Sequence, residues 1–239
     1  MEPTVKSWSV NSVDFSLELW PGNVFVPTSV SEIMAKTLGE LPENAVVVDM
    51  GCGSGFFSVM AAKMGAAKVY AVDVMPQAVE LTKRNVVRNG VAKNVEVHCG
   101  NLFDPIKEVK AHLIIVDVSG IAEKLARCTP WYPDPIATAS EDGTEPTVSV
   151  LKQGRDHLLP GGRLIFPFGS LANEKRILEV AQEVFQKNLR SLSEKLLPVT
   201  QQLRVAFDQC QDLIEKGFVY LVERRGKQYW LLRVYEASI

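Results

Sequence analysis

One stretch of the sequence, Val47-Val48-Asp49-Met50-Gly51-Cys52-Gly53-Ser54-Gly55-Phe56-Phe57, leads from an apolar strand pattern through a glycine-rich loop into a helical pattern. Glycines at such a turn permit positive φ and let the backbone touch a ligand without an intervening Cβ. Asp73 lies 22 positions after Gly51, at the end of the next expected strand. A carboxylate there can accept hydrogen bonds from both hydroxyls of a ribose. The stretch therefore predicts a site for a nucleoside-containing cofactor.

The spacing of the glycines separates two classes of cofactor. The dinucleotide fingerprint is Gly-x-Gly-x-x-Gly, whose last glycine allows close packing of the helix. Here the glycines stand at 51, 53 and 55, and position 56 is a bulky Phe. A nicotinamide-dependent oxidoreductase is therefore disfavoured. Two structural alternatives stay open, an ordinary tight turn for the loop and a helix N-cap role for Asp73 before Pro76.

Outward from this stretch, β-branched runs alternate with helical patterns, which is typical of a parallel sheet covered by helices. We expect strands at 46–48, 69–72, 95–97, 113–116 and 163–166, and helices at 57–64, 76–88, 147–159 and 174–185. A long loop at 129–146 and a C-terminal hairpin of 218–223 with 228–235 complete the pattern. We expect a single globular domain over residues 44–239, preceded by an N-terminal cap segment over residues 1–43.

Composition limits the classes of partner and compartment. The 239 residues are 46% apolar, and 26 Lys and Arg nearly balance 28 Asp and Glu, for a net charge of −2. This balance makes a nucleic-acid partner unlikely. No apolar run approaches the roughly 18 residues of a membrane span, so no membrane partner is expected. Four cysteines without a Cys-x-x-Cys pair favour reduced thiols, no metal site and a cytoplasmic location.

The shorter Gly-x-Gly-x-Gly loop after Asp49 resembles the first motif of class I S-adenosylmethionine-dependent methyltransferases, and the resemblance extends over residues 45–169. It implies S-adenosyl-L-methionine as the cofactor and a Rossmann-like, doubly wound α/β fold. The implied sheet is mostly parallel and seven-stranded, with an antiparallel C-terminal hairpin. The resemblance assigns the methionine end, the ribose and the adenine of the cofactor to Asp49, Gly51, Cys52, Gly53, Gly55, Asp73, Val74, Asn101 and Leu102, with Asn101 replacing the family's common Asp.

Within this class, residues 25–28 resemble the entry segment of the methyltransferases of release-factor glutamine and of ribosomal protein L11, and residues 143–146 resemble the release-factor glutamine enzymes. The chain departs from the glutamine and adenine N-methyltransferases after the fourth strand. It has Asp117-Val118-Ser119-Gly120 where those enzymes have Asn-Pro-Pro-Tyr or Asp-Pro-Pro-Tyr. The rigid turn that holds a planar amide is absent, so amide N-methylation is not carried over.

Asp117 is the candidate catalytic residue because the carboxyl ends of strands bind ligands in α/β sheets. It would orient the acceptor nucleophile or accept its proton, and the structural alternative is an Asp that caps its own loop. The candidate substrate-binding residues are Trp20, Phe25, Thr28, Ser119, Trp131 and Tyr132. The sequence predicts methyl transfer to a small molecule or a protein side chain. A cofactor-binding module or partner subunit that has lost catalysis is the alternative, and the acceptor atom and oligomeric state are left open.

Overall fold

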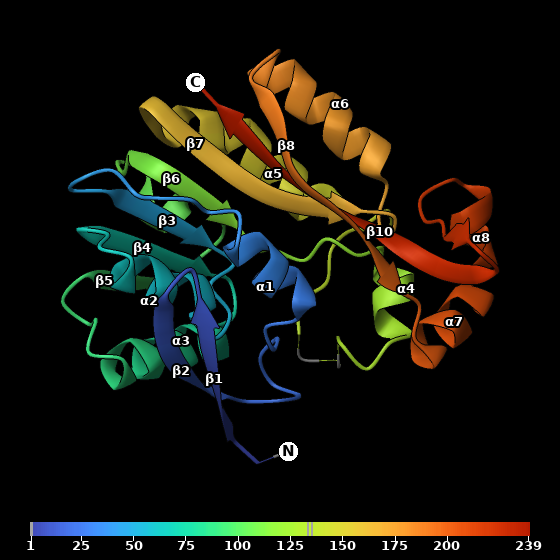
Figure 1. Ribbon diagram of the computed structural model, residues 1–239, viewed down its shortest axis with the longest axis horizontal. Coiled ribbons are helices and arrows are strands. Elements are labelled where there is room, and N and C mark those ends of the chain that lie inside the picture. Colours follow the sequence, from blue (N-terminus) through green and yellow to red (C-terminus); the bar gives the residue numbers. More distant parts are fainter. Residues whose placement is uncertain (1, 133, 135) are drawn as a thin grey trace.

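A mixed sheet forms the centre of the computed structural model, which describes residues 2–132, 134 and 136–239 (Figure 1). The strand order is β5-β4-β3-β6-β7-β10-β8, and the short β9 pairs with β10. Strands β3 to β7 pair in parallel, whereas β10 is antiparallel to both of its long neighbours. The strands of this sheet are β3 (Val46–Met50), β4 (Lys68–Asp73), β5 (Val95–Cys99), β6 (Ala111–Val116), β7 (Leu158–Gly169), β8 (Leu189–Pro198), β9 (Val222–Arg224) and β10 (Lys227–Ser238).

Helices cover both faces of the sheet. On one face lie α1 (Ser29–Ala35), α2 (Phe56–Lys63) and α3 (Pro76–Arg88), and on the other lie α5 (Glu145–Gly154) and α6 (Glu174–Phe185). The smaller helices are η1 (Asp104–Ile106), α4 (Glu123–Arg127), η2 (Arg155–His157), α7 (Gln201–Asp208) and α8 (Gln211–Glu215). Helices α4, α7 and α8 share a hydrophobic cluster of their own, at the right of Figure 1.

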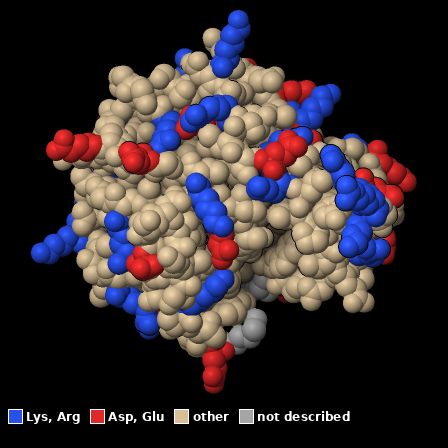
Figure 2. All heavy atoms as spheres, in the orientation of Figure 1, with Lys and Arg blue, Asp and Glu red and all other residues tan. Residues whose placement is uncertain are grey.

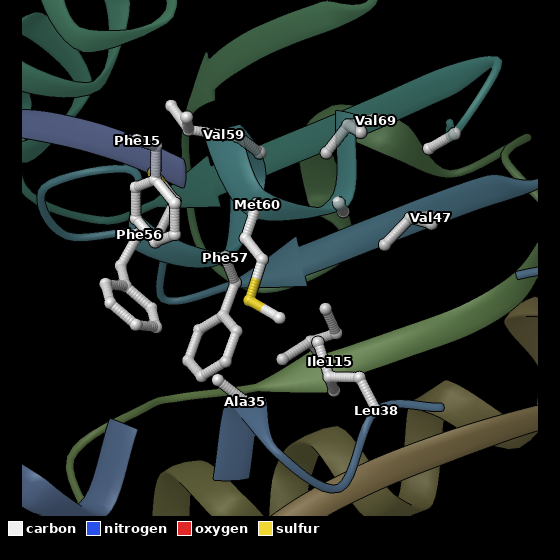
Figure 3. Packing of buried hydrophobic residues seen from close by; sticks show 14 of the residues in the cluster. Phe15, Ala35, Leu38, Val47, Phe56, Phe57, Val59, Met60, Val69 and Ile115 are labelled. Carbon is white, nitrogen blue, oxygen red and sulfur yellow. The ribbon is translucent and has the colours of Figure 1, made fainter. Parts of the chain in front are cut away.

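Strand β6 shows why the sheet needs two helical layers. It is almost continuously apolar, and its residues from Leu113 onward are buried. Because successive side chains of a strand point to opposite faces, Ile114 packs in one core and Ile115 in the other. Figure 3 shows the second of these cores, where Phe57 of α2 lies beside Ala35 of α1 and Met60 points towards Ile115.

A separate hairpin, β1 (Thr4–Val10) with β2 (Val13–Leu19), packs on the outer side of α2 and α3. Asn85 of α3 fixes it there with its side-chain amide. The amide accepts from Glu18 N at 2.8 Å and donates to Glu18 O and Ser54 O at 2.9 Å each. The N-terminal residues therefore form a hairpin that covers helices, while α1 covers the sheet itself.

The Rossmann-like fold is confirmed, and the helices expected at 76–88 and 174–185 have those bounds in the structure. The helix expected at 147–159 ends earlier, at Gly154, because Gly154 is close-packed against Leu164 and a 3₁₀ turn follows. Residues 160–162, between this expected helix and the strand expected at 163–166, are an irregularity inside β7, where the register with β6 shifts. Among the described residues, no helix has the length and apolar character needed to cross a bilayer.

The expected antiparallel C-terminal hairpin forms from β9 and β10. Its first strand, β9, is short, and its second strand, β10, lies between β7 and β8 and is not the edge strand of the sheet. The edge beyond β10 is β8, a segment that carries no clear apolar alternation. The sequence therefore predicted the antiparallel strand and missed its neighbour.

Asn85→Ala tests how the hairpin is held. The substitution leaves backbone groups of Glu18 and Ser54 without their partner, so we expect the free energy of unfolding to fall by about 2–4 kcal/mol. Urea denaturation measures it, and the Glu18 amide should also exchange faster with deuterated solvent. Val87→Ala, on the exposed side of the same helix, is the control and should change stability by less than about 0.5 kcal/mol. Equal stability of the two variants would contradict this account of the hairpin.

Candidate functional site

A cavity of about 750 Å³ opens at the carboxyl ends of the central strands. This volume is within the usual range for small-molecule and cofactor sites. One wall is formed by the glycine loop after β3 and the residues that follow β4 and β5. The opposite wall is formed by residues of β7, β8 and β10 and by the loop after α4. The cavity therefore connects the predicted cofactor loop with the antiparallel part of the sheet.

The glycine loop has the conformation that its residue types permit. Gly51, Gly53 and Gly55 have φ values of 81°, 54° and 81°, a region that side-chain-bearing residues rarely adopt. Space is a second requirement at Gly51, where a Cβ would lie 2.7 Å from the carbonyl oxygen of Asp117. Thr82 of α3 holds the loop from behind, its hydroxyl donating to Gly53 O at 3.0 Å.

Asp73 ties the glycine loop to the start of α3. Its Oδ2 accepts from Gly53 N and its Oδ1 from Met75 N, both at 2.9 Å. Burial raises the pKa of Asp73, although the backbone donors oppose the shift. The carboxylate also lines the cavity. The N-cap residue of α3 is Met75, without a side-chain cap, so the N-cap alternative for Asp73 is wrong. The bonds that Asp73 makes to the loop backbone are compatible with a ligand-binding role.

Asp49 lies behind the loop and does not line the cavity. It is fully buried, and the hydroxyl of Ser58 donates to its Oδ2. Its Oδ1 is buried with no partner among the residues that the structure describes. Burial raises the pKa of Asp49 to about 7, and the nearby Asp117 and Asp73 add to the shift. Asp49 can therefore influence a ligand only indirectly, through the glycine loop in front of it and through the charge of its carboxylate.

Asp117 follows β6 and lines the cavity. Its backbone N–H donates to Met50 O at 2.9 Å, and its Oδ2 accepts from the hydroxyl of Ser31 at 3.2 Å. Ser31 also accepts from the backbone N–H of Thr28, the N-cap residue of α1, at 3.4 Å. The side chain of Asp117 is thus bonded to a distant segment and not to its own loop. Burial raises the pKa of Asp117 to about 6.

The loop after β5 supplies Asn101 and Leu102 to the same cavity. Leu102 has a φ of 47°, so the chain turns sharply here. Gly100 before them is packed against the ring of Pro105, where a Cβ would lie 3.0 Å from the ring. The tight packing sets the direction in which Asn101 leaves the strand.

The cavity brings together most of the residues that the sequence predicted. Of the cofactor set, Gly51, Cys52, Gly53, Asp73, Val74, Asn101 and Leu102 line it, and Asp49 and Gly55 do not. Of the substrate set, Phe25, Thr28, Ser119, Trp131 and Tyr132 line it. The structure does not bring Trp20 to the cavity, because its ring packs in a separate cluster beside α3 and its Nε1 donates to Glu18.

Sequence reasoning missed the residues that complete the far wall. They come from segments far apart in the sequence, and they are Ile121, Ile136, Leu171, Leu197, Trp230 and Leu232. It also missed Ser31, the partner of Asp117. The only sequence signal for Ser31 was its position three residues after the N-cap Thr28, in a capping box.

The geometry fits S-adenosylmethionine, the cofactor implied by the sequence. The nearest atoms to a Cβ on Gly53 would be 3.9 Å away, so the loop backbone faces open space that a ligand can fill. Carboxylate and amide oxygens of Asp73 and Asn101 lie on the same cavity. These groups match the hydrogen-bonding needs of a ribose and of an adenine amino group.

Comparison with known proteins agrees with this geometry. Residues 30–143 match the family model described as Ribosomal protein L11 methyltransferase (PrmA). Ribosomal protein L11 methyltransferase of Alkaliphilus metalliredigens is 35% identical over 122 residues, which are 49% of this chain and 38% of that protein. The protein of the same name from Caldanaerobacter subterraneus subsp. tengcongensis is 28% identical over 184 residues, 75% of this chain and 57% of that protein. The chain thus covers less than two thirds of these relatives.

Solved structures show the same fold. The ribosomal protein L11 methylase of Lactobacillus delbrueckii subsp. bulgaricus has a TM-score of 0.56 at 16% identity, over 92% of this chain and 83% of that one. The tRNA m1G37 methyltransferase of M. jannaschii has a TM-score of 0.58 at 16% identity, over 98% of this chain and 55% of that one. In its fold, its glycine loop and its sequence the chain is thus similar to S-adenosylmethionine-dependent methyltransferases of class I.

Proposed function

We propose that the chain transfers a methyl group from S-adenosylmethionine to a nucleophile on a protein side chain or a small molecule. One observation carries the proposal. Asp117 and all the predicted cofactor residues except Asp49 and Gly55 line a single cavity, which also includes residues of β8 and β10. A methyltransferase needs this arrangement because donor and acceptor must meet in one enclosed space.

In this proposal the chain's own residues hold the cofactor by its two polar ends. The backbone of the loop from Gly51 to Gly53 faces the methionine end, Asp73 accepts from the ribose hydroxyls, and the Asn101 amide oxygen accepts from the adenine amino group. The carboxylates of the buried Asp49 and the half-buried Asp117 favour a cationic group nearby. These roles support binding of a sulfonium-containing cofactor.

When bound, S-adenosylmethionine supplies a methyl group, whose carbon accepts the nucleophile's lone pair while the breaking carbon–sulfur bond leaves its electrons on sulfur. The protein's task is to align the nucleophile, exclude water and take up a proton. Asp117 is proposed to accept a hydrogen bond from the acceptor and then its proton. Its hydrogen bond to Ser31 fixes one carboxylate oxygen and leaves the other for the acceptor.

The class of acceptor is part of the proposal. The named activity of the relatives, methylation of ribosomal protein L11, supports a protein acceptor. The similarity to a tRNA methyltransferase is at 16% identity and concerns the fold. The statement that a nucleic-acid partner is unlikely therefore stays a prediction. The cytoplasmic location also stays a prediction.

Residues 30–143, which match the family model, contain the cofactor loop but none of the wall residues from β7, β8 and β10.

A cofactor-binding module without catalysis is the second candidate, because the chain lacks the Asn-Pro-Pro-Tyr turn of amide methyltransferases. The two candidates differ in one measurement. Incubation with methyl-labelled S-adenosylmethionine and a cell extract should label an acceptor in the first case. Binding of the cofactor without any transferred label would favour the second.

Asp73→Ala tests the cofactor site. Loss of two charge-assisted hydrogen bonds to the ribose should weaken binding of S-adenosylhomocysteine by about 2–4 kcal/mol, or roughly 30- to 1,000-fold in Kd. Isothermal titration calorimetry measures the change. Asp73→Asn keeps an acceptor oxygen for Gly53 N and should lose less affinity. Unchanged affinity in the folded Ala variant would remove Asp73 from the ribose site.

Asp117→Asn tests the catalytic role through the pH dependence. The pKa of Asp117 lies at about 6, so its carboxylate is ionised above that pH and able to accept a proton. We expect kcat/KM to fall as pH drops through about 6, and Asp117→Asn to reduce kcat/KM by roughly 100-fold while removing this limb of the profile. Binding of S-adenosylhomocysteine should be nearly unchanged. A variant that keeps both rate and pH profile would show that Asp117 is not the base.

A further inference from the structure

We propose that the acceptor is an aromatic small molecule, uncharged or cationic, whose N–H or O–H nucleophile faces Asp117. The inference rests on the proposed methyl transfer and specifies the substrate class of the same site. It comes from the part of the cavity beyond the cofactor loop, where the lining residues of β7, β8 and β10 lie outside residues 30–143, the range that the family model matches.

The sheet supplies an apolar wall for this part of the cavity. Trp230 and Leu232 of β10 are two residues apart, so their side chains share a face of the sheet. Leu197 of β8 is the register partner of Trp230. These three residues all line the cavity, and Gly169, opposite Leu232, adds a flat stretch of backbone to the same wall. The wall is therefore broad and has no polar side chain along these strands.

The loop after α4 supplies aromatic side chains to the same cavity. Tyr132 packs against Phe25 with ring centroids 5.1 Å apart, and Trp131 lines the cavity beside them. Ile121 and Ile136 fill the space around these rings. A lining of aromatic rings and apolar side chains favours a flat aromatic ligand, because ring stacking adds to the burial of apolar area.

The charges that line the cavity exclude an anionic acceptor. Among the described lining residues the charged ones are Asp73 and Asp117, and no Lys, Arg or His is present. Carboxylates and phosphates are normally bound by Arg, Lys or clustered backbone N–H groups. On the side of the molecule that Figure 2 shows, Lys and Arg are scattered over the outer surface and interspersed with Asp and Glu. The free-energy cost of desolvating an anion beside two carboxylates would therefore not be offset by a positive side chain among the described lining residues.

Polar groups are concentrated next to Asp117. The Oγ atom of Ser119, two residues along the chain, is buried, and the hydroxyl of Tyr132 lies close enough to interact with it. Burial raises the pKa of Tyr132 to about 12, so its hydroxyl stays protonated. A ligand that presents one polar atom to Asp117 and Ser119, and a ring to the apolar walls, satisfies both parts of the site.

The methyl transfer balances with these groups alone. The nitrogen or oxygen lone pair of the acceptor forms the new bond to the methyl carbon, and the carbon–sulfur bond breaks with its electrons remaining on sulfur. The proton of the acceptor passes to the Asp117 carboxylate and then to water. No oxidant, reductant or further reactant is needed.

Binding to the wild-type chain tests the proposal, with S-adenosylhomocysteine present to fill the cofactor end. Tyramine and tryptamine are the aromatic probes, 4-hydroxyphenylacetate and indole-3-acetate are their anionic counterparts, and putrescine is the aliphatic amine. We expect the aromatic amines to bind at least 10-fold more tightly than either comparison group, by calorimetry and by quenching of tryptophan fluorescence. Methyl transfer to the same probes is the second measurement.

Leu197→Lys supplies the sharper test because it places a cation on the apolar wall. It should weaken tyramine binding at least 10-fold and strengthen 4-hydroxyphenylacetate binding, without changing the affinity for S-adenosylhomocysteine. Leu196→Lys is the matched control, since Leu196 is the neighbouring residue on β8 and does not line the cavity. It should leave all three affinities within about twofold.

The outcomes separate this proposal from the proposed function. Failure to bind S-adenosylhomocysteine would overturn the methyltransferase proposal itself. Binding of S-adenosylhomocysteine together with no binding of either aromatic amine would overturn only the aromatic acceptor. The same conclusion would follow if putrescine, purified ribosomal protein L11 or a tRNA transcript were methylated in preference to the aromatic amines.

Discussion

The ends of two central strands approach so closely that residue 51 has no room for a side chain. A Cβ on Gly51 would lie 2.7 Å from the carbonyl oxygen of Asp117. The start of the cofactor loop and the candidate catalytic residue are therefore in direct backbone contact, and Asp117 N also donates to Met50 O. Any displacement of one strand end would move both halves of the site together. The packing of the sheet thus holds the methyl-donor part and the methyl-acceptor part of the candidate site in a fixed position relative to each other.

This close packing also concentrates negative charge in a small volume. Asp49 is buried and Asp117 is half-buried, and each has a pKa raised by desolvation. The charge of Asp117 raises the pKa of Asp49 further. Such a pair gains from a cation placed between or beside its members, because the cation offsets both the desolvation and the mutual repulsion. The two carboxylates therefore favour a sulfonium ligand, because no Lys or Arg among the described lining residues neutralises them.

The sequence was sufficient for the parallel half of the fold and for the cofactor side of the cavity. These parts depend on local signals, such as the glycines at 51, 53 and 55 and the Pro at the start of α3. It was insufficient for β8, whose mixed pattern identifies no buried face, and for the far wall, which depends on strand order. Trp20 was misplaced because an aromatic residue before the first strand carries no signal for the surface it covers. The pairing of Ser31 with Asp117 could not be seen either, since 86 positions separate them.

The strand order β7-β10-β8 has a consequence for how the protein is made. In the part of the chain that the structure describes, β8 pairs with β10 alone, yet β8 precedes β10 in the sequence. During synthesis on a ribosome, β8 must wait unpaired until β10 has emerged and inserted beside β7. The cofactor loop, by contrast, needs only strands made earlier. A nascent chain is therefore able to form its cofactor wall while its second wall is still incomplete.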